Sequence, residues 1–264
     1  MARLLRAMLL LFLLSQLPMN ALAAEELHAI KEKASTGKFY ERALDFFTKK
    51  IPEAFEKQLE NSQKYIDVIT EVFTEEDIPL DIAYLPLIES GFSPLSVGRG
   101  DAVGLWQLVK STGRKYGLKI DKYVDERKDP VKSTYAAAKY LNDLHRIFGA
   151  WDVALAAYNA GAGKIKRIAA GRSFDLPEVI NRYLAKFMAA STVAQNPEKF
   201  GIEPPETLYS DYMDYIEITT EEAVSLQAIA EKYDTTVSAI KELNPALLKD
   251  STPPYKYILR LPSH

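Results

Sequence analysis

One stretch of the sequence decides the fold, and it reads Pro86-Leu-Ile-Glu-Ser-Gly-Phe-Ser-Pro-Leu-Ser-Val-Gly-Arg-Gly-Asp-Ala-Val-Gly-Leu-Trp-Gln107. A carboxylate, Glu89, ends an apolar helical run, and a glycine- and serine-rich loop follows it. The C-terminal dipole of a helix and burial both disfavour a negative charge, so both raise the pKa of a carboxyl group. The stretch therefore predicts a general acid at Glu89. A buried carboxyl with a purely structural role fits the same pattern.

Helical patterns extend on both sides of this stretch. Pro79 fits the first turn of the helix that carries Glu89, and Pro86 is expected to kink it. Asp129 is an expected N-cap, with Pro130 at the first helical position. No convincing strand precedes residue 195, so we predict an all-α region. The expected helices cover residues 39–59, 62–73, 79–89, 104–116, 130–148, 151–160, 165–170 and 177–194.

The composition changes after residue 196. Residues 197–211 are rich in proline and are expected to connect two domains. Beyond them, strands are predicted at 212–218 and 255–261, with two helices between them, the second capped by Thr235 or Thr236. This β-α-α-β unit is small, so we expect it to lean on its neighbour. The predicted fold class is thus mainly α, with a small C-terminal β-α-α-β unit.

Charge and cysteine content exclude several classes of function. The net charge of −3 argues against a nucleic-acid-binding protein. The sequence contains no cysteine, which excludes disulfides, thiol nucleophiles and lipid attachment through a cysteine. Its three histidines, His28, His145 and His264, are scattered and form no metal-ligand pair, which argues against zinc chemistry.

The N-terminal segment predicts export. Residues 1–23 contain Arg3 and Arg6, an apolar run and then Ala21-Leu-Ala23, which is the pattern of a cleaved secretory signal. The apolar run is shorter than the ~20 residues that a membrane-spanning helix needs. Residues 24–38 are expected to form a leading helix.

Other side chains could complete a site around Glu89. Asp101 is the candidate second carboxylate, although an aspartate beside glycine is more often a turn residue. Aromatic side chains could stack on sugar rings, but at helical spacing they more often pack in a core. We interpret Trp151 as a core residue and leave Trp106 open between core and site. The remaining aromatic candidates are Tyr158 and Tyr183.

Three motifs together resemble the lytic transglycosylases related to soluble lytic transglycosylase and goose-type lysozyme. They are Glu89-Ser90, then Gln107 in Gly104-Leu-Trp-Gln107, then Ala157-Tyr-Asn-Ala-Gly161. Residues 84–90, 111–118 and 125–130 are similar to the membrane-bound type D branch, and the C-terminal unit resembles a divergent lysin motif.

The resemblance implies a lysozyme-like α fold that cleaves the β-1,4 bond of peptidoglycan between N-acetylmuramic acid and N-acetylglucosamine. It implies that Glu89 acts as acid and then as base, leaving a 1,6-anhydro end, with neither cofactor nor metal. The implied partners are peptidoglycan glycan strands, and the implied location is the periplasm or cell envelope. The implied substrate-binding residues are Ser90, Ser96, Gln107, Tyr158, Asn159 and Tyr183.

The chain departs from the family pattern at three positions. Gly98 stands where a serine is frequent, with Ser96 two residues earlier. Val179 stands where the family tends to have glutamate, and Glu222-Ala-Val-Ser-Leu226 replaces the usual Gly-Asp-Thr-Leu of the lysin motif. These departures affect substrate positioning and leave open whether the C-terminal unit binds sugar.

The sequence thus leads to one domain plan and three functions. The plan has a signal peptide at 1–23, N-terminal helices at 24–74, a lysozyme-like domain at 75–196, a linker at 197–211 and a lysin-motif-like unit at 212–264. The first function is an exported lytic transglycosylase. The alternatives are a hydrolase of the goose-lysozyme kind and a non-catalytic wall-binding protein on the same scaffold.

Overall fold

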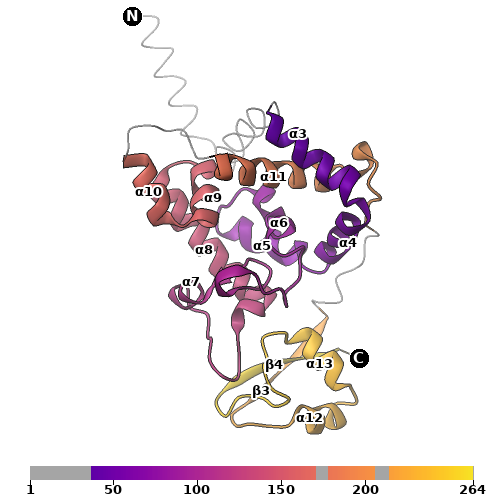
Figure 1. Ribbon diagram of the computed structural model, residues 1–264. Helices are drawn as coiled ribbons and strands as arrows, with labels where there is room; N and C mark the ends of the chain where they lie inside the picture. The colour runs from indigo at the N-terminus through magenta and orange to yellow at the C-terminus, as the bar shows by residue number, and fades with distance from the viewer. Residues whose placement is uncertain (1–36, 171–177, 206–213, 264) are drawn as a thin grey trace, which may run out of the picture.

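The computed structural model describes residues 37–170, 178–205 and 214–263. A helical body (residues 37–170 and 178–205) stands above a small C-terminal unit (residues 214–263), as Figure 1 shows. The expected signal at 1–23, most of the leading helix and part of the linker lie outside the described residues. The longer helices of the body are α3 (Lys38–Asp45), α4 (Pro52–Gln63), α5 (Ile66–Glu75), α8 (Pro130–Phe148), α9 (Trp151–Ala160), α10 (Ala162–Ala170) and α11 (Glu178–Gln195).

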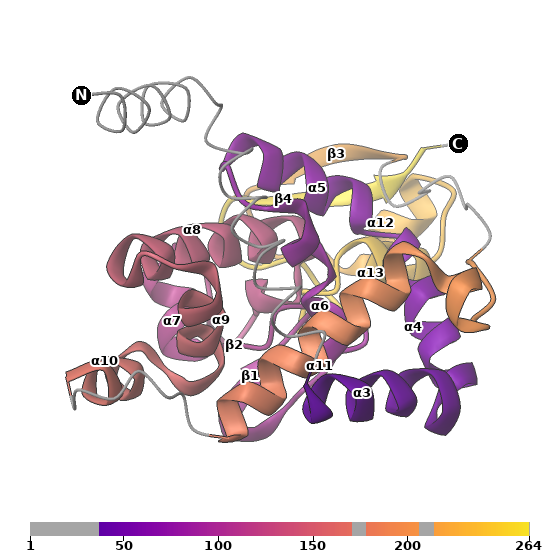
Figure 2. The same cartoon turned by 90° about the horizontal axis from the view of Figure 1, so that it is seen from above.

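Local signals place α8 and α9 correctly. The Asp129 side chain accepts a hydrogen bond from the Lys132 backbone N–H, Pro130 opens α8, and Gly149 ends it in the left-handed conformation. The run Ala154–Ala157 on α9 is fully buried, because alanine lets neighbouring helices approach closely. Figure 2 shows α9 beside α8, with α11 crossing the body next to α3. The predicted α class is confirmed.

Both tryptophans belong to the core of the helical body. Trp151 is buried, as the sequence predicts. Trp106 is also fully buried, and its indole N–H donates to the Thr134 hydroxyl at 3.0 Å. Trp106 therefore packs inside the body, and neither indole is available to stack on a sugar.

The helix expected from Pro79 to Glu89 is interrupted. A 3₁₀ turn covers Leu80–Tyr84, and α6 (Pro86–Glu89) starts afresh after Leu85. Pro86 therefore stands at the first position of a short helix, where its missing N–H costs nothing. The predicted kink within a longer helix is wrong. Glu89 is the last residue of α6, as expected, and Gly91 follows with φ 62°.

The expected helix at 104–116 is wrong in its first half. Strands β1 (Ala102–Val103) and β2 (Leu108–Val109) form a short antiparallel hairpin there, and α7 (Lys110–Lys115) begins only afterwards. Gly104 and Gln107 have positive φ values of 84° and 48°, which a right-handed helix does not allow. The turn buries Leu105 and Trp106 instead.

The C-terminal unit has the predicted β-α-α-β order. Its elements are β3 (Tyr215–Thr220), α12 (Leu226–Lys232), α13 (Val237–Leu243) and β4 (Tyr257–Pro262), and the strands pair antiparallel. Ser225 caps α12 and Thr236 caps α13. The small apolar core of this unit includes Val124, which the helical body contributes. The expectation that the unit leans on its neighbour is confirmed.

Backbone and side-chain contacts form a seam between the helical body and the C-terminal unit. The Leu248 N–H donates to the Tyr123 carbonyl at 2.8 Å, and the Asp125 N–H donates to the Ala246 carbonyl at 2.9 Å. The buried Arg260 guanidinium pairs with Asp129 at 3.2 Å, so one carboxylate both caps α8 and holds β4. These contacts fix the orientation of the unit.

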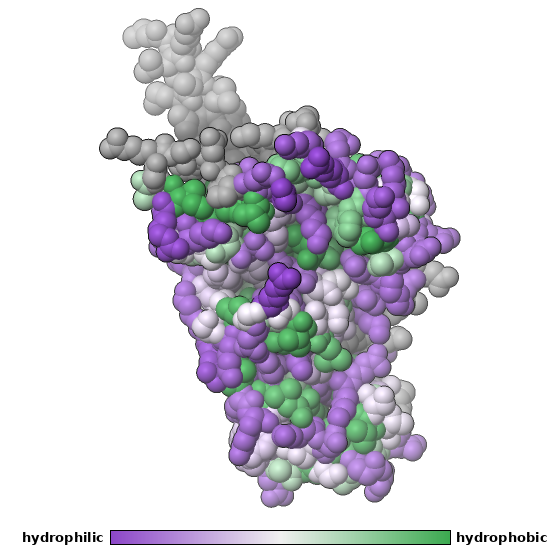
Figure 3. All heavy atoms as spheres, viewed as in Figure 1, coloured by the Kyte–Doolittle hydropathy of each residue, from purple (hydrophilic) through white to green (hydrophobic). Residues whose placement is uncertain are grey.

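The surface alternates in polarity. On the face shown in Figure 3, apolar patches lie between hydrophilic residues and form no continuous belt. Across residues 37–170, 178–205 and 214–263, no helix combines the length and the apolar character that crossing a membrane requires.

Candidate active site around Glu89

Glu89 is half-buried at the C-terminal end of α6, next to the buried Leu85 and Leu87. Burial is the largest influence on its pKa and raises it above the ordinary glutamate value. A hydrogen bond from Tyr183 and the positive charge of Lys186 act in the opposite direction but do not cancel the effect of burial. Helix α6 is only four residues long, so the predicted contribution of a helix dipole is small.

Two tyrosines from different helices lie beside Glu89. The Tyr183 hydroxyl, from α11, donates to Glu89 Oε1 at 2.6 Å. The Tyr158 hydroxyl, from α9, donates to the Trp106 carbonyl at 2.6 Å. Burial, with the nearby Glu89 charge, raises the pKa of both tyrosines well above the ordinary value. Both hydroxyls therefore remain protonated donors at neutral pH.

The hairpin turn is tied to α6 and α9 through consecutive carbonyls. The Ser90 hydroxyl donates to the Leu105 carbonyl at 2.8 Å, and the Trp106 carbonyl receives the Tyr158 hydrogen bond. Ser90 and Tyr158 therefore position the loop that faces Glu89. Asn159 is exposed at the end of α9.

The Gln107 side chain turns back into its own loop. Its Nε2 donates to the Gly104 carbonyl at 2.9 Å and to the Ser96 carbonyl at 3.3 Å. Both amide hydrogens are thus used by the backbone, and Oε1 lies against Gly98. Ser96 contributes its backbone to this arrangement, and its side chain is half-buried.

Asp101 does not join Glu89. It is exposed in a left-handed turn with φ 63°, and its carboxylate lies 3.3 Å from the Arg127 guanidinium. The interpretation of Asp101 as a turn residue agrees with this placement. Within the described ranges, no cluster of His, Asp and Glu side chains forms a candidate metal site.

Comparisons with known proteins agree with this geometry. Residues 74–176 match the model of the transglycosylase SLT domain, and residues 214–264 match that of the LysM-like domain of lytic transglycosylase MltD. The chain is thus similar to an SLT domain and, further along, to an MltD-type LysM-like domain. The SLT match includes Glu89, Gln107 and Tyr158, and ends before Tyr183.

The chain is also similar to parts of curated relatives. Membrane-bound lytic murein transglycosylase D of Escherichia coli K12 is 32% identical over 202 residues, which cover 72% of this chain and 44% of that protein. A putative tributyltin chloride resistance protein of Alteromonas sp. strain M-1 is 37% identical over 101 residues, which cover 38% of this chain and 48% of that protein. The chain thus spans less than half the length of these relatives.

One solved structure is also similar. An inactive mutant of lytic transglycosylase Slt from Pseudomonas aeruginosa matches with a TM-score of 0.42 and 21% identity. The match covers 52% of this chain and 25% of that one.

The approach of the Gln107 side chain favours glycine at position 98. A Cβ atom built on Gly98 would lie 2.2 Å from Gln107 Oε1, so a serine there would displace the amide that braces the loop. Gly98 has φ −101°, which any residue adopts. The preference for glycine therefore comes from the close approach of the Gln107 side chain and not from backbone conformation.

Gly98→Ala is expected to lower the free energy of unfolding by about 1–2 kcal/mol, because it displaces the Gln107 amide from two carbonyls. In a Gln107→Ala background the clash is absent. In that background Gly98→Ala should leave the free energy of unfolding unchanged or raise it by about 0.4–1 kcal/mol, because alanine restricts the unfolded chain more than glycine does. Urea unfolding of the four proteins of this double-mutant cycle measures the coupling. Equal effects in both backgrounds would contradict the proposed contact.

Two residues near the candidate site are not predicted from the sequence. Lys186 follows Tyr183 by one helical turn on α11, and its charge acts on Glu89. The i, i+3 spacing from Tyr183 was the available signal. Arg127 stands in the sequence only as one residue of the stretch 125–130. In the structure it is buried and donates to the Asp101 carbonyl, just before the hairpin, at 2.5 Å and to the Leu108 carbonyl within it at 3.1 Å.

Proposed function

We propose that the protein is a peptidoglycan lytic transglycosylase in which Glu89 acts first as acid and then as base. The observation that carries the proposal is the half-buried Glu89, whose pKa is raised by burial while Tyr183 holds its Oε1. A raised pKa favours the protonated form of the carboxyl group, which is the form that can protonate a leaving group. The SLT match and the relatives named lytic murein transglycosylase support peptidoglycan as the substrate.

In the proposed reaction, the Glu89 carboxyl donates its proton to the glycosidic oxygen as the C1–O bond of the muramyl residue breaks. The resulting carboxylate then takes the proton from the muramyl C6 hydroxyl, whose oxygen forms the new bond to C1. The products are a 1,6-anhydro end and a free 4-hydroxyl, with no water consumed. One carboxyl group suffices, which fits the diversion of Asp101 to Arg127.

The surrounding residues have supporting roles in this proposal. Tyr183 orients Glu89, while Ser90, Gln107 and Tyr158 hold the loop opposite it. Ser96 and Asn159 line the part of the site where the substrate binds. The export pattern at residues 1–23 and the envelope location of peptidoglycan support action in the periplasm or cell envelope. The domain plan drawn from the sequence remains part of the proposal.

Mass spectrometry of purified sacculi digested with the intact chain tests the reaction. Muropeptides lighter by one water than the hydrolysed products carry anhydro ends and support the transglycosylase. Reducing ends would instead establish a hydrolase of the goose-lysozyme kind. Absence of product, with binding to sacculi retained, would establish a wall-binding protein.

Tyr183→Phe is expected to lower kcat/KM by about tenfold, since one charge-assisted hydrogen bond is lost. That bond favours the carboxylate form, so its removal raises the Glu89 pKa further. The alkaline limb of the pH–activity profile should therefore move to higher pH. Tyr135→Phe is the matched control, because the Tyr135 hydroxyl donates to the exposed Glu75 at 3.0 Å. An unmoved alkaline limb in Tyr183→Phe would contradict the proposed role.

The same pKa shift affects stability. A carboxyl whose folded-state pKa is raised stabilises the native state fully below its unfolded-state pKa, near the ordinary glutamate value of 4.5. That contribution is lost as pH rises through the folded-state pKa. Tyr183→Phe should therefore unfold more easily than the parent protein at neutral pH, and the difference should disappear in acid.

A further inference from the structure

A pocket opens in the C-terminal unit, far along the chain from Glu89. It has a volume of about 540 Å³ and lies between the end of β3, the segment after it and α12. Ligand pockets are commonly about 300–1,000 Å³, so it can hold a small ligand. Ile218, Val224 and Ile229 provide its apolar part.

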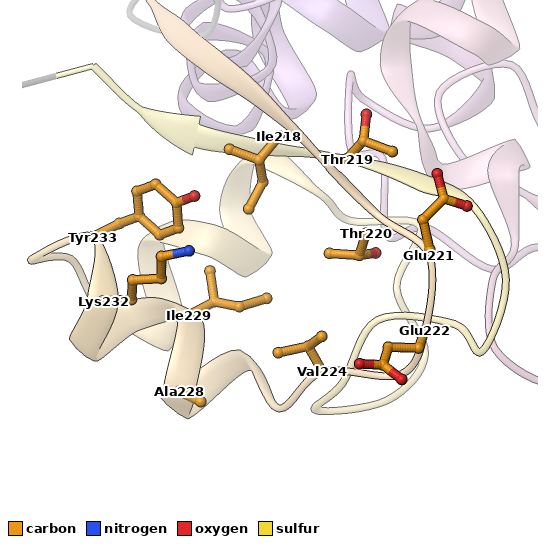
Figure 4. A pocket seen from close by; sticks show the side chains of 10 residues that line it. All are labelled: Ile218, Thr219, Thr220, Glu221, Glu222, Val224, Ala228, Ile229, Lys232 and Tyr233. Atoms are coloured by element: carbon orange, nitrogen blue, oxygen red, sulfur yellow. The ribbon is translucent and has the colours of Figure 1, made fainter.

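The two ends of this pocket carry opposite charge. Figure 4 shows Glu221 and Glu222 at one end, with Lys232 and Tyr233 at the other. The Lys232 ammonium points toward the interior of the pocket and lies 5.1 Å from the centre of the Tyr233 ring. Within the part of the chain that the structure describes, Glu221 and Glu222 form no ion pair. A ligand with a cation at one end and an anion at the other would therefore meet complementary charges.

A buried hydroxyl lies between these ends. Thr220 is only 8% exposed, and its Oγ1 finds no hydrogen-bond partner among the described residues. Buried polar atoms are almost always paired, and this oxygen has almost no accessible surface, so a ligand group pairs with it only when the Thr220 side chain rotates toward the pocket. Figure 4 places Thr220 in the middle of the pocket, where that group would lie.

We propose that this pocket binds a short peptide that carries a free amine and a free carboxylate, of the kind found in the peptide side branches of peptidoglycan. The inference of that source rests on the proposed function. The amine lies at Glu221 and Glu222, the carboxylate lies at Lys232, and a peptide N–H or carbonyl pairs with the Thr220 hydroxyl. The apolar floor of Ile218 and Val224 accepts the methylene groups between the charges.

The charge pattern favours a peptide over a neutral glycan. A glycan of N-acetylated sugars carries no charge that would use Lys232 and Glu222 at opposite ends. Sugar recognition by stacking would need an aromatic platform, and Tyr233 already has Lys232 against its ring. The glycan is therefore the competing outcome of the test.

The test is a titration of the intact, isotope-labelled chain followed by NMR. The probe is a synthetic tripeptide that reproduces a peptide side branch of peptidoglycan. It has a free C-terminal carboxylate and a lysine-type side-chain amine. The matched probes are the same peptide with its amine acetylated and its carboxylate amidated, and an oligomer of N-acetylglucosamine. We expect the free tripeptide to shift the amide signals of Thr220 and Lys232, and the blocked peptide to bind at least about fivefold more weakly, as two ion pairs are lost.

Substitutions within the pocket give the second arm. Lys232→Gln and Glu222→Gln should each weaken binding of the tripeptide about two- to fivefold. Thr220→Val, which removes only the hydroxyl, should weaken it about fivefold. Lys249→Gln is the control, because Lys249 is exposed in the same unit and does not line the pocket.

The proposal is overturned if the free tripeptide shifts no amide signal of the pocket, or if the blocked peptide binds as tightly as the free one. It is also overturned if the N-acetylglucosamine oligomer shifts the pocket signals and the tripeptide does not. None of these readings depends on catalysis. If sacculi are not cleaved but the tripeptide binds the pocket, the proposed function fails while this inference stands. If sacculi are cleaved and the tripeptide does not bind, only this inference fails.

Discussion

Glu89→Gln is expected to reduce the release of anhydro-ended fragments from sacculi by at least about 10²–10⁴-fold, the usual contribution of a general acid or base. Glutamine has nearly the same shape, and its amide oxygen can accept the Tyr183 hydrogen bond. It can neither donate a proton to the glycosidic oxygen nor take one from the C6 hydroxyl. The measurement is the rate of fragment release from sacculi, followed by mass spectrometry.

The fold should survive this change. Burial raises the Glu89 pKa, so the ionised carboxylate destabilises the native state at neutral pH. Glutamine carries no charge and removes this destabilisation. The free energy of unfolding of Glu89→Gln should therefore equal or exceed that of the parent protein above about pH 4.5. Glu75→Gln is the matched control, since Glu75 also accepts a tyrosine hydroxyl but lies exposed. Cleavage by Glu89→Gln at the parental rate would exclude Glu89 as the catalytic acid.

Arg127→Met is expected to lower the free energy of unfolding by about 3–5 kcal/mol, because it leaves the buried Asp125 carboxylate without its cation. The Arg127 guanidinium holds both oxygens of Asp125, at 2.9 and 2.7 Å. It also bonds the Asp101 and Leu108 carbonyls, which belong to the hairpin beside the site. Activity should fall with stability, since this hairpin presents the Leu105 and Trp106 carbonyls to Ser90 and Tyr158.

Denaturant unfolding measures the stability effect, and Arg146→Gln serves as its control. Arg146 pairs with Asp143 on the surface, where an ion pair contributes at most about 1 kcal/mol. Arg127→Met/Asp125→Asn should recover part of the loss, because no unpaired charge then stays buried. A loss below that of Arg146→Gln would contradict the assigned role of Arg127.

Local signals in the sequence predict a large part of the fold. Helices α8 and α9 and the order of the C-terminal unit follow from caps, prolines and apolar spacing, which act over a few residues. The hairpin at Ala102–Val109 could not be predicted this way. It depends on Gly104, where a Cβ would lie 1.9 Å from the Arg127 carbonyl, and on burial of Trp106 against distant helices.

The candidate site, too, is predicted from the sequence only in part. The position of Glu89 at the end of an apolar helix is visible in the sequence, and so is a raised pKa. Its contact with Tyr183, 94 residues later, depends on how α11 packs against α6, which spacing alone does not reveal. The sequence also does not show that the Gln107 amide turns inward, because that direction follows from the positive φ of Gln107 and the open space at Gly98.

The seam between the two parts of the chain has a geometric consequence. A module on a flexible tether only raises the local concentration of whatever it holds. Here Val124 of the helical body inserts into the core of the C-terminal unit. Backbone hydrogen bonds and the Arg260–Asp129 ion pair fix the orientation of that unit. Any ligand bound by the C-terminal unit is therefore kept at one distance and one angle from Glu89.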